Sequence, residues 1–152
     1  MKQILKRIDG TIIEESETLT FKELVIKNKA NLRGAYLRGA DLCGANLSSL
    51  QIARLQIVPQ TGSFIGYKKL LDNSICKLLI TEDAKRSNAP NSRKCRASKA
   101  IILEGNGCSK HDHSFLYKEG ETIEVEDFDE QWWVECSTGI HFFLSKEEAL
   151  VY

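Results

Sequence analysis

Cysteine and histidine side chains in the C-terminal half of this sequence could support more than one kind of chemistry. One choice is a zinc site, which needs four converging ligands in tetrahedral geometry. The candidate ligands are Cys95, Cys108, His111 and Cys136. Two residues separate Cys108 from His111, which suits zinc, but no two cysteines have the close spacing of a zinc finger or ribbon. The alternative is that these cysteines are buried and behave as small hydrophobic residues.

The same residue types could support thiol catalysis, with Cys108 or Cys136 as nucleophile and His111 or His141 as base. Such a cysteine needs a lowered pKa and a positioned imidazole. The sequence shows neither, so we predict no catalytic residue. An enzyme that acts on nucleotides or their conjugates, with His111, His141 and Cys136 near the reacting centre, is the alternative function.

A third possibility is an anion site, because the segment 85–99 is rich in Lys and Arg and contains no acidic residue. Its Asn, Ser and Pro content favours a loop, on which guanidinium groups could bind phosphate oxygens in paired geometry. Serine and histidine could add hydrogen bonds, and tryptophan could stack on a base. The predicted ligand-binding residues are Arg86, Arg93, Lys94, Arg96, Ser109, His111, Trp132 and His141. In the alternative, this basic loop docks on the acidic segment 119–130.

Composition restricts the class of protein. The 152 residues are 42% hydrophobic and carry a formal net charge of zero, which is typical of a folded chain and argues against a general nucleic-acid binder. Residues 1–7 lack the apolar run of a signal peptide, so we expect a cytoplasmic protein without a membrane segment. The five cysteines are an odd, widely spread set, and free thiols are expected. No cofactor is predicted.

The candidate site residues must be positioned by short helices and strands. Asp9-Gly10 predicts a primed turn in a hairpin over residues 1–15. Thr18 or Thr20 can cap a following helix, with Glu23 completing a capping box. Strands are predicted at 64–70, 75–80, 100–103, 115–117, 122–125, 132–136 and 140–144. Ser145 can cap a final helix.

A period of five residues runs from position 30 to position 57. Small residues occupy Ala30, Ala35, Ala40 and Ala45, and branched aliphatic residues follow two places later at Leu32, Leu37, Leu42, Leu47, Ile52 and Ile57. Both sets should point inward, because apolar positions at a fixed period build one continuous core in stacked units. This pattern resembles the pentapeptide-repeat family, which implies a right-handed quadrilateral β-helix with four repeats per turn. The repeat would then supply barely one and a half turns.

The segments 92–100, 107–115 and 135–143 resemble a domain of unknown function that follows short pentapeptide repeats in tailed-phage and large DNA virus proteins. The resemblance covers residues 65–152. It implies a phage protein without naming an activity.

Together these features predict a mainly β protein with two parts: a hairpin, capping helix and repeat coil at 1–60, and a small, mostly β (α+β) domain at 61–152. The leading hypothesis is a non-enzymatic phage accessory protein that binds a small anionic ligand, with a nucleotide-derived signal of host defence as one such ligand. A scaffold that binds a host protein through the coil is another alternative. Flat faces around Tyr36 and Cys43 favour a homo-oligomer through the coil. Outward Arg33, Arg38 and Arg54 argue against mimicry of duplex DNA.

Overall fold

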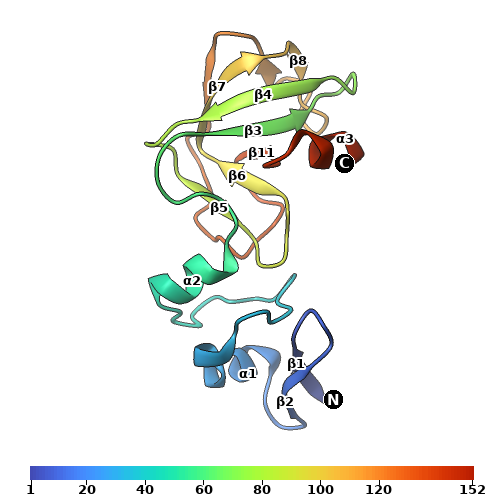
Figure 1. Cartoon of the computed structure of the whole chain (residues 1–152), viewed down its shortest axis with the longest axis vertical. Helices are drawn as coiled ribbons and strands as arrows, with labels where there is room; N and C mark the ends of the chain where they lie inside the picture. The colour runs from blue at the N-terminus through green and yellow to red at the C-terminus, as the bar shows by residue number, and fades with distance from the viewer.

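The computed structural model describes residues 1–152 and is mainly β, with few helices. Figure 1 shows an elongated molecule, with the N-terminal hairpin at one end and the larger sheet at the other. The strands are β1 (Gln3–Lys6), β2 (Ile12–Ser16), β3 (Phe64–Lys69), β4 (Ile75–Ile80), β5 (Arg86–Asn88), β6 (Cys95–Ala97), β7 (Lys99–Glu104), β8 (Gly107–Cys108), β9 (Leu116–Tyr117), β10 (Thr122–Glu124) and β11 (Ile140–Phe142). The helices are α1 (Phe21–Lys27), the 3-10 turn η1 (Lys29–Asn31), α2 (Ser49–Leu55) and α3 (Lys146–Val151).

The predicted N-terminal hairpin and helix are present. Strands β1 and β2 pair antiparallel. The primed turn is wrong in detail: of Asp9 and Gly10, only Gly10 has a positive φ, and Gly10 N donates to Arg7 O, as in a turn that ends in a glycine bulge. Helix α1 begins at the predicted capping box, where Thr20 and Glu23 cap each other's backbone N–H groups.

The five-residue period produces a series of tight turns. The backbone N–H groups of Ala35, Ala40 and Ala45 each donate to the carbonyl of the leucine three residues earlier. Gly34, Gly39 and Gly44 occupy the third position of these turns with φ near +70°, a conformation that glycine adopts without strain. The inward residues Leu32, Ala35, Leu37, Leu42 and Ala45 are buried with Leu24 and Val25 of α1.

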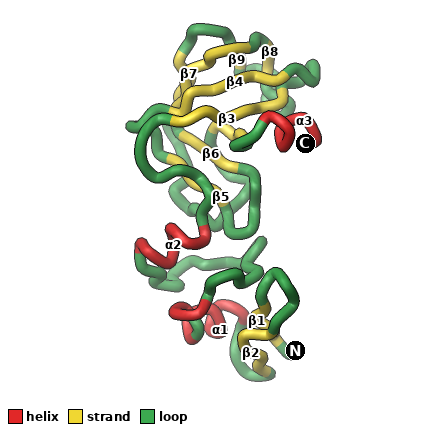
Figure 2. Tube along the Cα trace, viewed as in Figure 1, coloured by secondary structure: helices red, strands yellow, loops and turns green.

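The repeat ends earlier than its spacing predicts. Ala30 is exposed in η1, and the chain from Ser49 forms α2, capped by Ser48 and Gln51, instead of more coil. Ile57 is therefore not a core residue of the coil. Figure 2 shows the segment between η1 and α2 as loop, and no closed solenoid is detected there. The predicted extent of the coil is wrong because a serine cap and good helix formers follow residue 47.

The C-terminal part contains two main antiparallel sheets. The first has the strand order β10-β7-β4-β3, and the second has the order β11-β6-β5. Tyr67 and Phe143 exchange backbone hydrogen bonds of 2.8 Å, which join the edge of β3 to the chain just after β11. Side chains of both sheets share one core, which includes Leu78, Ile102 and Phe142.

Two sequence-based predictions fail in this part. Residues 132–136 form turns rather than a strand. The segment 85–99 is not a loop throughout: it forms β5, β6 and the start of β7, and its residues 94–98 are buried. Its charged side chains concealed this, because Arg and Lys seldom occupy buried strands.

The two parts of the chain are in contact. Trp132 and Trp133, from the second part, pack against the core of the repeat. Leu37 N donates to the side chain of Asn91 over 2.6 Å, and Arg38 forms an ion pair with Glu135 over 3.5 Å. These contacts join the repeat segment to the C-terminal part.

Candidate functional site

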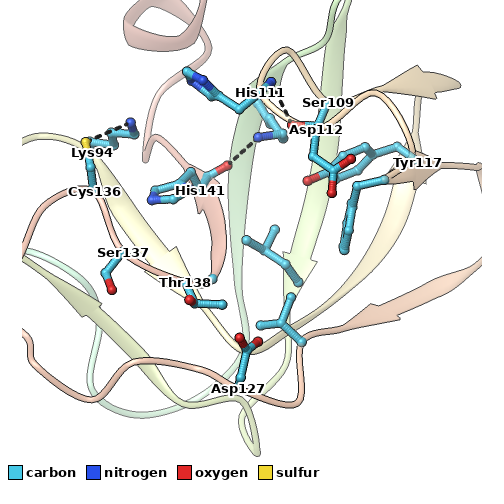
Figure 3. A pocket seen from close by; sticks show the side chains of 15 residues that line it. Lys94, Ser109, His111, Asp112, Tyr117, Asp127, Cys136, Ser137, Thr138 and His141 are labelled. Carbon is cyan, nitrogen blue, oxygen red and sulfur yellow. Dashed lines mark hydrogen bonds between the residues drawn. The ribbon is translucent and has the colours of Figure 1, made fainter.

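A cavity of about 530 Å³ lies in the C-terminal part. Figure 3 shows side chains from distant segments around it, with His111 and Asp127 at opposite ends of the view. Its lining residues are Lys68, Lys94, Ser109, His111, Asp112, Phe115, Tyr117, Val125, Asp127, Cys136, Ser137, Thr138, Gly139, Ile140 and His141. A volume of this size matches the usual range of small-molecule sites.

Lys68 enters the cavity from a core-facing position of β3. Side chains alternate along a strand, so Gly66, Lys68 and Leu70 share one face, and all three are buried. The exposed fraction of Lys68 is only 9%. Its Nζ donates to the carbonyl of His141 over 3.4 Å and lies 5.4 Å from the centre of the Tyr117 ring. Burial, and secondarily the charge of Lys94, lowers the pKa of Lys68 to about 8.

Lys94 is the second buried cation of the cavity, with an exposed fraction of 5%. Its Nζ donates to the hydroxyl of Tyr152 over 2.8 Å and lies 3.6 Å from Cys136 Sγ. Figure 3 shows this contact between Lys94 and the thiol. Neither Lys94 nor Lys68 forms an ion pair with a carboxylate.

His141 lies close enough to both lysines to be affected by their charges, and its ring is neutral. Its Nε2 is buried and has no hydrogen-bond partner. Burial, followed by the charges of Lys94, Lys68 and Arg96, lowers the pKa of His141 to about 3. The imidazole therefore adds no charge to the cavity wall.

Acidification should destabilise the protein through His141. The folded pKa of about 3 lies below the unfolded value of 6.5, so the contribution is complete above pH 6.5 and is lost as the pH falls toward 3. Between pH 7 and pH 5 we expect a loss of about 2 kcal/mol in the free energy of unfolding. Urea unfolding of the wild type and of His141→Gln, at both pH values, measures this loss of stability. An equal loss in both proteins would contradict this assignment.

The cavity contains half of the predicted ligand-binding residues: Lys94, Ser109, His111 and His141. The three arginines lie elsewhere. Arg86 donates to the carbonyls of Gly62, Glu82 and Ala84, and Arg93 forms an ion pair with Glu148. Arg96 is fully buried, and three backbone carbonyls accept from its guanidinium. These arginines therefore stabilise the fold around the site.

Trp132 is not part of the cavity, because its ring packs on the core of the repeat. The four candidate metal ligands are also not brought together: no group of three or more His, Cys, Asp or Glu side chains is close enough to hold a metal ion. Cys95 is buried in the core, and burial raises the pKa of its thiol to about 12. All five cysteines are free, as predicted.

The basic and acidic segments lie side by side. Strand β10 pairs with β7, which places Glu124 opposite Lys99, and Lys85 forms an ion pair with Glu130. The basic segment therefore does lie against the acidic segment, as in the alternative prediction. The contact is made by paired strands and turns rather than by a loop.

Lys68 was not identified from the sequence. The available signal was the run Phe64-Ile65-Gly66-Tyr67-Lys68-Lys69-Leu70, in which period-two alternation places Lys68 on the same face as Gly66 and Leu70. A lysine at an inward position of a predicted strand indicates a buried charge that needs a partner.

The fold and cavity define a small β domain, with a lysine-lined cavity, that follows a short pentapeptide-repeat segment. Residues 54–149 match the family of unknown function DUF5758, and since this is more than half of the chain, the protein belongs to that family. Residues 28–54 match the family described as pentapeptide repeats (8 copies), and such repeats fit a β-helix. No curated protein and no solved structure matches the chain. None of its helices has the length and apolar character needed to cross a membrane.

Proposed function

We propose that the protein binds a small anionic ligand in the cavity between Lys68, Lys94 and His141. One observation carries the proposal: two lysines, each more than nine-tenths buried, line the same cavity, and neither is paired with a carboxylate. Burying a charge without a counter-charge is costly. A bound anion would supply that counter-charge.

The surroundings of these lysines support the same ligand chemistry. A smaller hollow beside the cavity is lined by Lys68, Lys69, Lys94, Lys110, His111, His141, Phe143 and Tyr152, without any acidic residue. An anionic group at this end would receive charge-assisted hydrogen bonds, which are stronger than those between neutral groups.

The remaining walls suit the body of a larger ligand. Phe115, Tyr117 and Val125 offer apolar and aromatic surface, while Thr138 and Asp127 offer polar groups. Nucleotides combine a phosphate with an aromatic base that has hydrogen-bond donors, so they fit this distribution.

The proposal therefore includes sequestration of a nucleotide-derived host-defence signal by a phage accessory protein, which follows from the resemblance of residues 65–152 to a domain of phage and large DNA virus proteins. It also includes quadrilateral geometry for the repeat coil and association of copies through that coil.

Replacing Lys94 with Met should weaken binding of an anionic ligand about 10- to 100-fold. The reason is the loss of a charge-assisted hydrogen bond, whose contribution is about 1.5–3 kcal/mol. Calorimetric titration with inorganic phosphate and with nucleoside phosphates measures the change. Native mass spectrometry of the same samples reports the number of subunits, and the mass of the released ligand shows whether it has been altered.

Lys77→Met is the matched control. Lys77 belongs to β4 and forms a surface ion pair with Glu104, away from the cavity. Its substitution should leave the affinity unchanged. Equal affinities for wild type, Lys77→Met and Lys94→Met would refute this site, and an altered ligand mass would favour the enzyme that acts on nucleotides.

A further inference from the structure

Lys68 presents an amine to the cavity as well as a charge. Its Nζ has one hydrogen-bond partner, the carbonyl of His141 at 3.4 Å, and no carboxylate lies within ion-pair distance. The side chain is held against the Tyr117 ring at the wall of the cavity. A ligand in the cavity can therefore reach the nitrogen directly.

The groups that face Lys68 favour a neutral amine. Lys94, on the segment before β6, adds a second positive charge, and His141 on β11 is neutral. Tyr117 on β9 and Cys76 on β4 are protonated at neutral pH, because burial raises the pKa of both, to about 12 for Cys76. None of these groups supplies a negative charge. Asp112 and Asp127 also line the cavity, but neither forms an ion pair with Lys68. A lysine that is desolvated beside another cation is the usual form of an amine nucleophile.

We propose that Lys68 forms a reversible imine with small aldehydes or ketones that carry an anionic group. The inference rests on the proposed function, because Lys94 and its neighbours would hold the anionic group of the same molecule. The neutral Nζ attacks the carbonyl carbon, a C–N bond forms and the oxygen becomes a hydroxyl. The hydroxyl then leaves as water together with the second amine hydrogen. Hydrolysis reverses the step, and no oxidant or reductant takes part.

Reductive trapping tests this inference. The full chain is incubated near pH 8 with pyridoxal 5′-phosphate, an aldehyde that carries a phosphate, and cyanoborohydride reduces any imine to a stable secondary amine. Intact mass and peptide mapping should show one adduct per chain, on Lys68. Pyridoxal, which lacks the phosphate, should react at least about tenfold more slowly if the phosphate contributes about 1.4 kcal/mol.

Lys68→Arg is the main control because it keeps the charge but cannot form an imine. This variant should lose the adduct. An adduct that persists in Lys68→Arg, or labelling spread equally over surface lysines such as Lys77, would overturn the imine while leaving the phosphate titration to decide the anion site. Labelling of Lys68 without any phosphate binding or competition would support the imine and reject the proposed anion site.

Discussion

Replacing Lys68 with Met should make the protein more stable and, at the same time, eliminate anion binding. Methionine keeps the length of the side chain but removes a charge that the fold buries without a carboxylate partner. The pKa of Lys68 falls from its ordinary 10.5 to about 8 on folding, which corresponds to about 3 kcal/mol of destabilisation at neutral pH. Removal of this charge should raise the free energy of unfolding by about 2–3 kcal/mol.

The increase in stability caused by Lys68→Met should depend on pH in a defined direction. Below pH 8 the lysine is charged in both the folded and the unfolded state, so the destabilisation is complete there. Between pH 8 and 10.5 the folded protein releases its proton first, and the gain from Lys68→Met should shrink. Above 10.5 the amine is neutral in both states and the difference should disappear. Urea unfolding at pH 7, 9 and 11 measures this course.

The control for Lys68→Met is Lys77→Met on the neighbouring strand, where the lysine is at the surface. This control should change neither stability nor phosphate affinity appreciably. A destabilised Lys68→Met protein at pH 7 would mean that the lysine stabilises the fold, and the argument for an anion site would then fail. A stabilised variant with poor ligand affinity would show that Lys68 serves binding at the expense of stability.

The second large effect is expected for Arg96→Ala, which should lower the free energy of unfolding by about 3–5 kcal/mol. Arg96 is fully buried, and its guanidinium donates to the carbonyls of Asp129, Gln131 and Thr138 over 2.9–3.0 Å. It also lies over the Phe128 ring. Alanine would remove the guanidinium donor from all three carbonyls, leave that of Asp129 without a partner and create a void. Thermal or urea unfolding measures the loss.

Arg93→Ala is the matched control in the same segment. The Arg93 side chain is 57% exposed and pairs with Glu148 at the surface, so its removal should cost less than about 1 kcal/mol. Arg96→Lys should give an intermediate result, since an ammonium cannot reproduce the planar fork of a guanidinium. Similar losses for Arg96→Ala and Arg93→Ala would contradict the role of Arg96 in fixing the segment 129–138, which lines part of the cavity.

Local chemistry made several elements predictable. The capping box at Thr20, the N-cap at Ser145 and the five-residue period were readable because the residues that form each feature lie within a few positions of one another. The length of the coil was not readable in this way. After Ser48, helix propensity competed with a repeat pattern that becomes less regular there. The turns at 132–136 were mistaken for a strand because Trp and Val favour sheets.

The sequence by itself determined the mainly β class, the repeat segment and the presence of unusually concentrated positive charge at 85–99. Only the tertiary structure decided which charges are available to a ligand. Arg96 is satisfied by carbonyls from a distant segment, whereas Lys68 and Lys94 line one cavity without an ion pair to a carboxylate. Whether a charge is paired depends on neighbours far away in the sequence and on the desolvation that burial imposes. Composition and spacing specify neither of these.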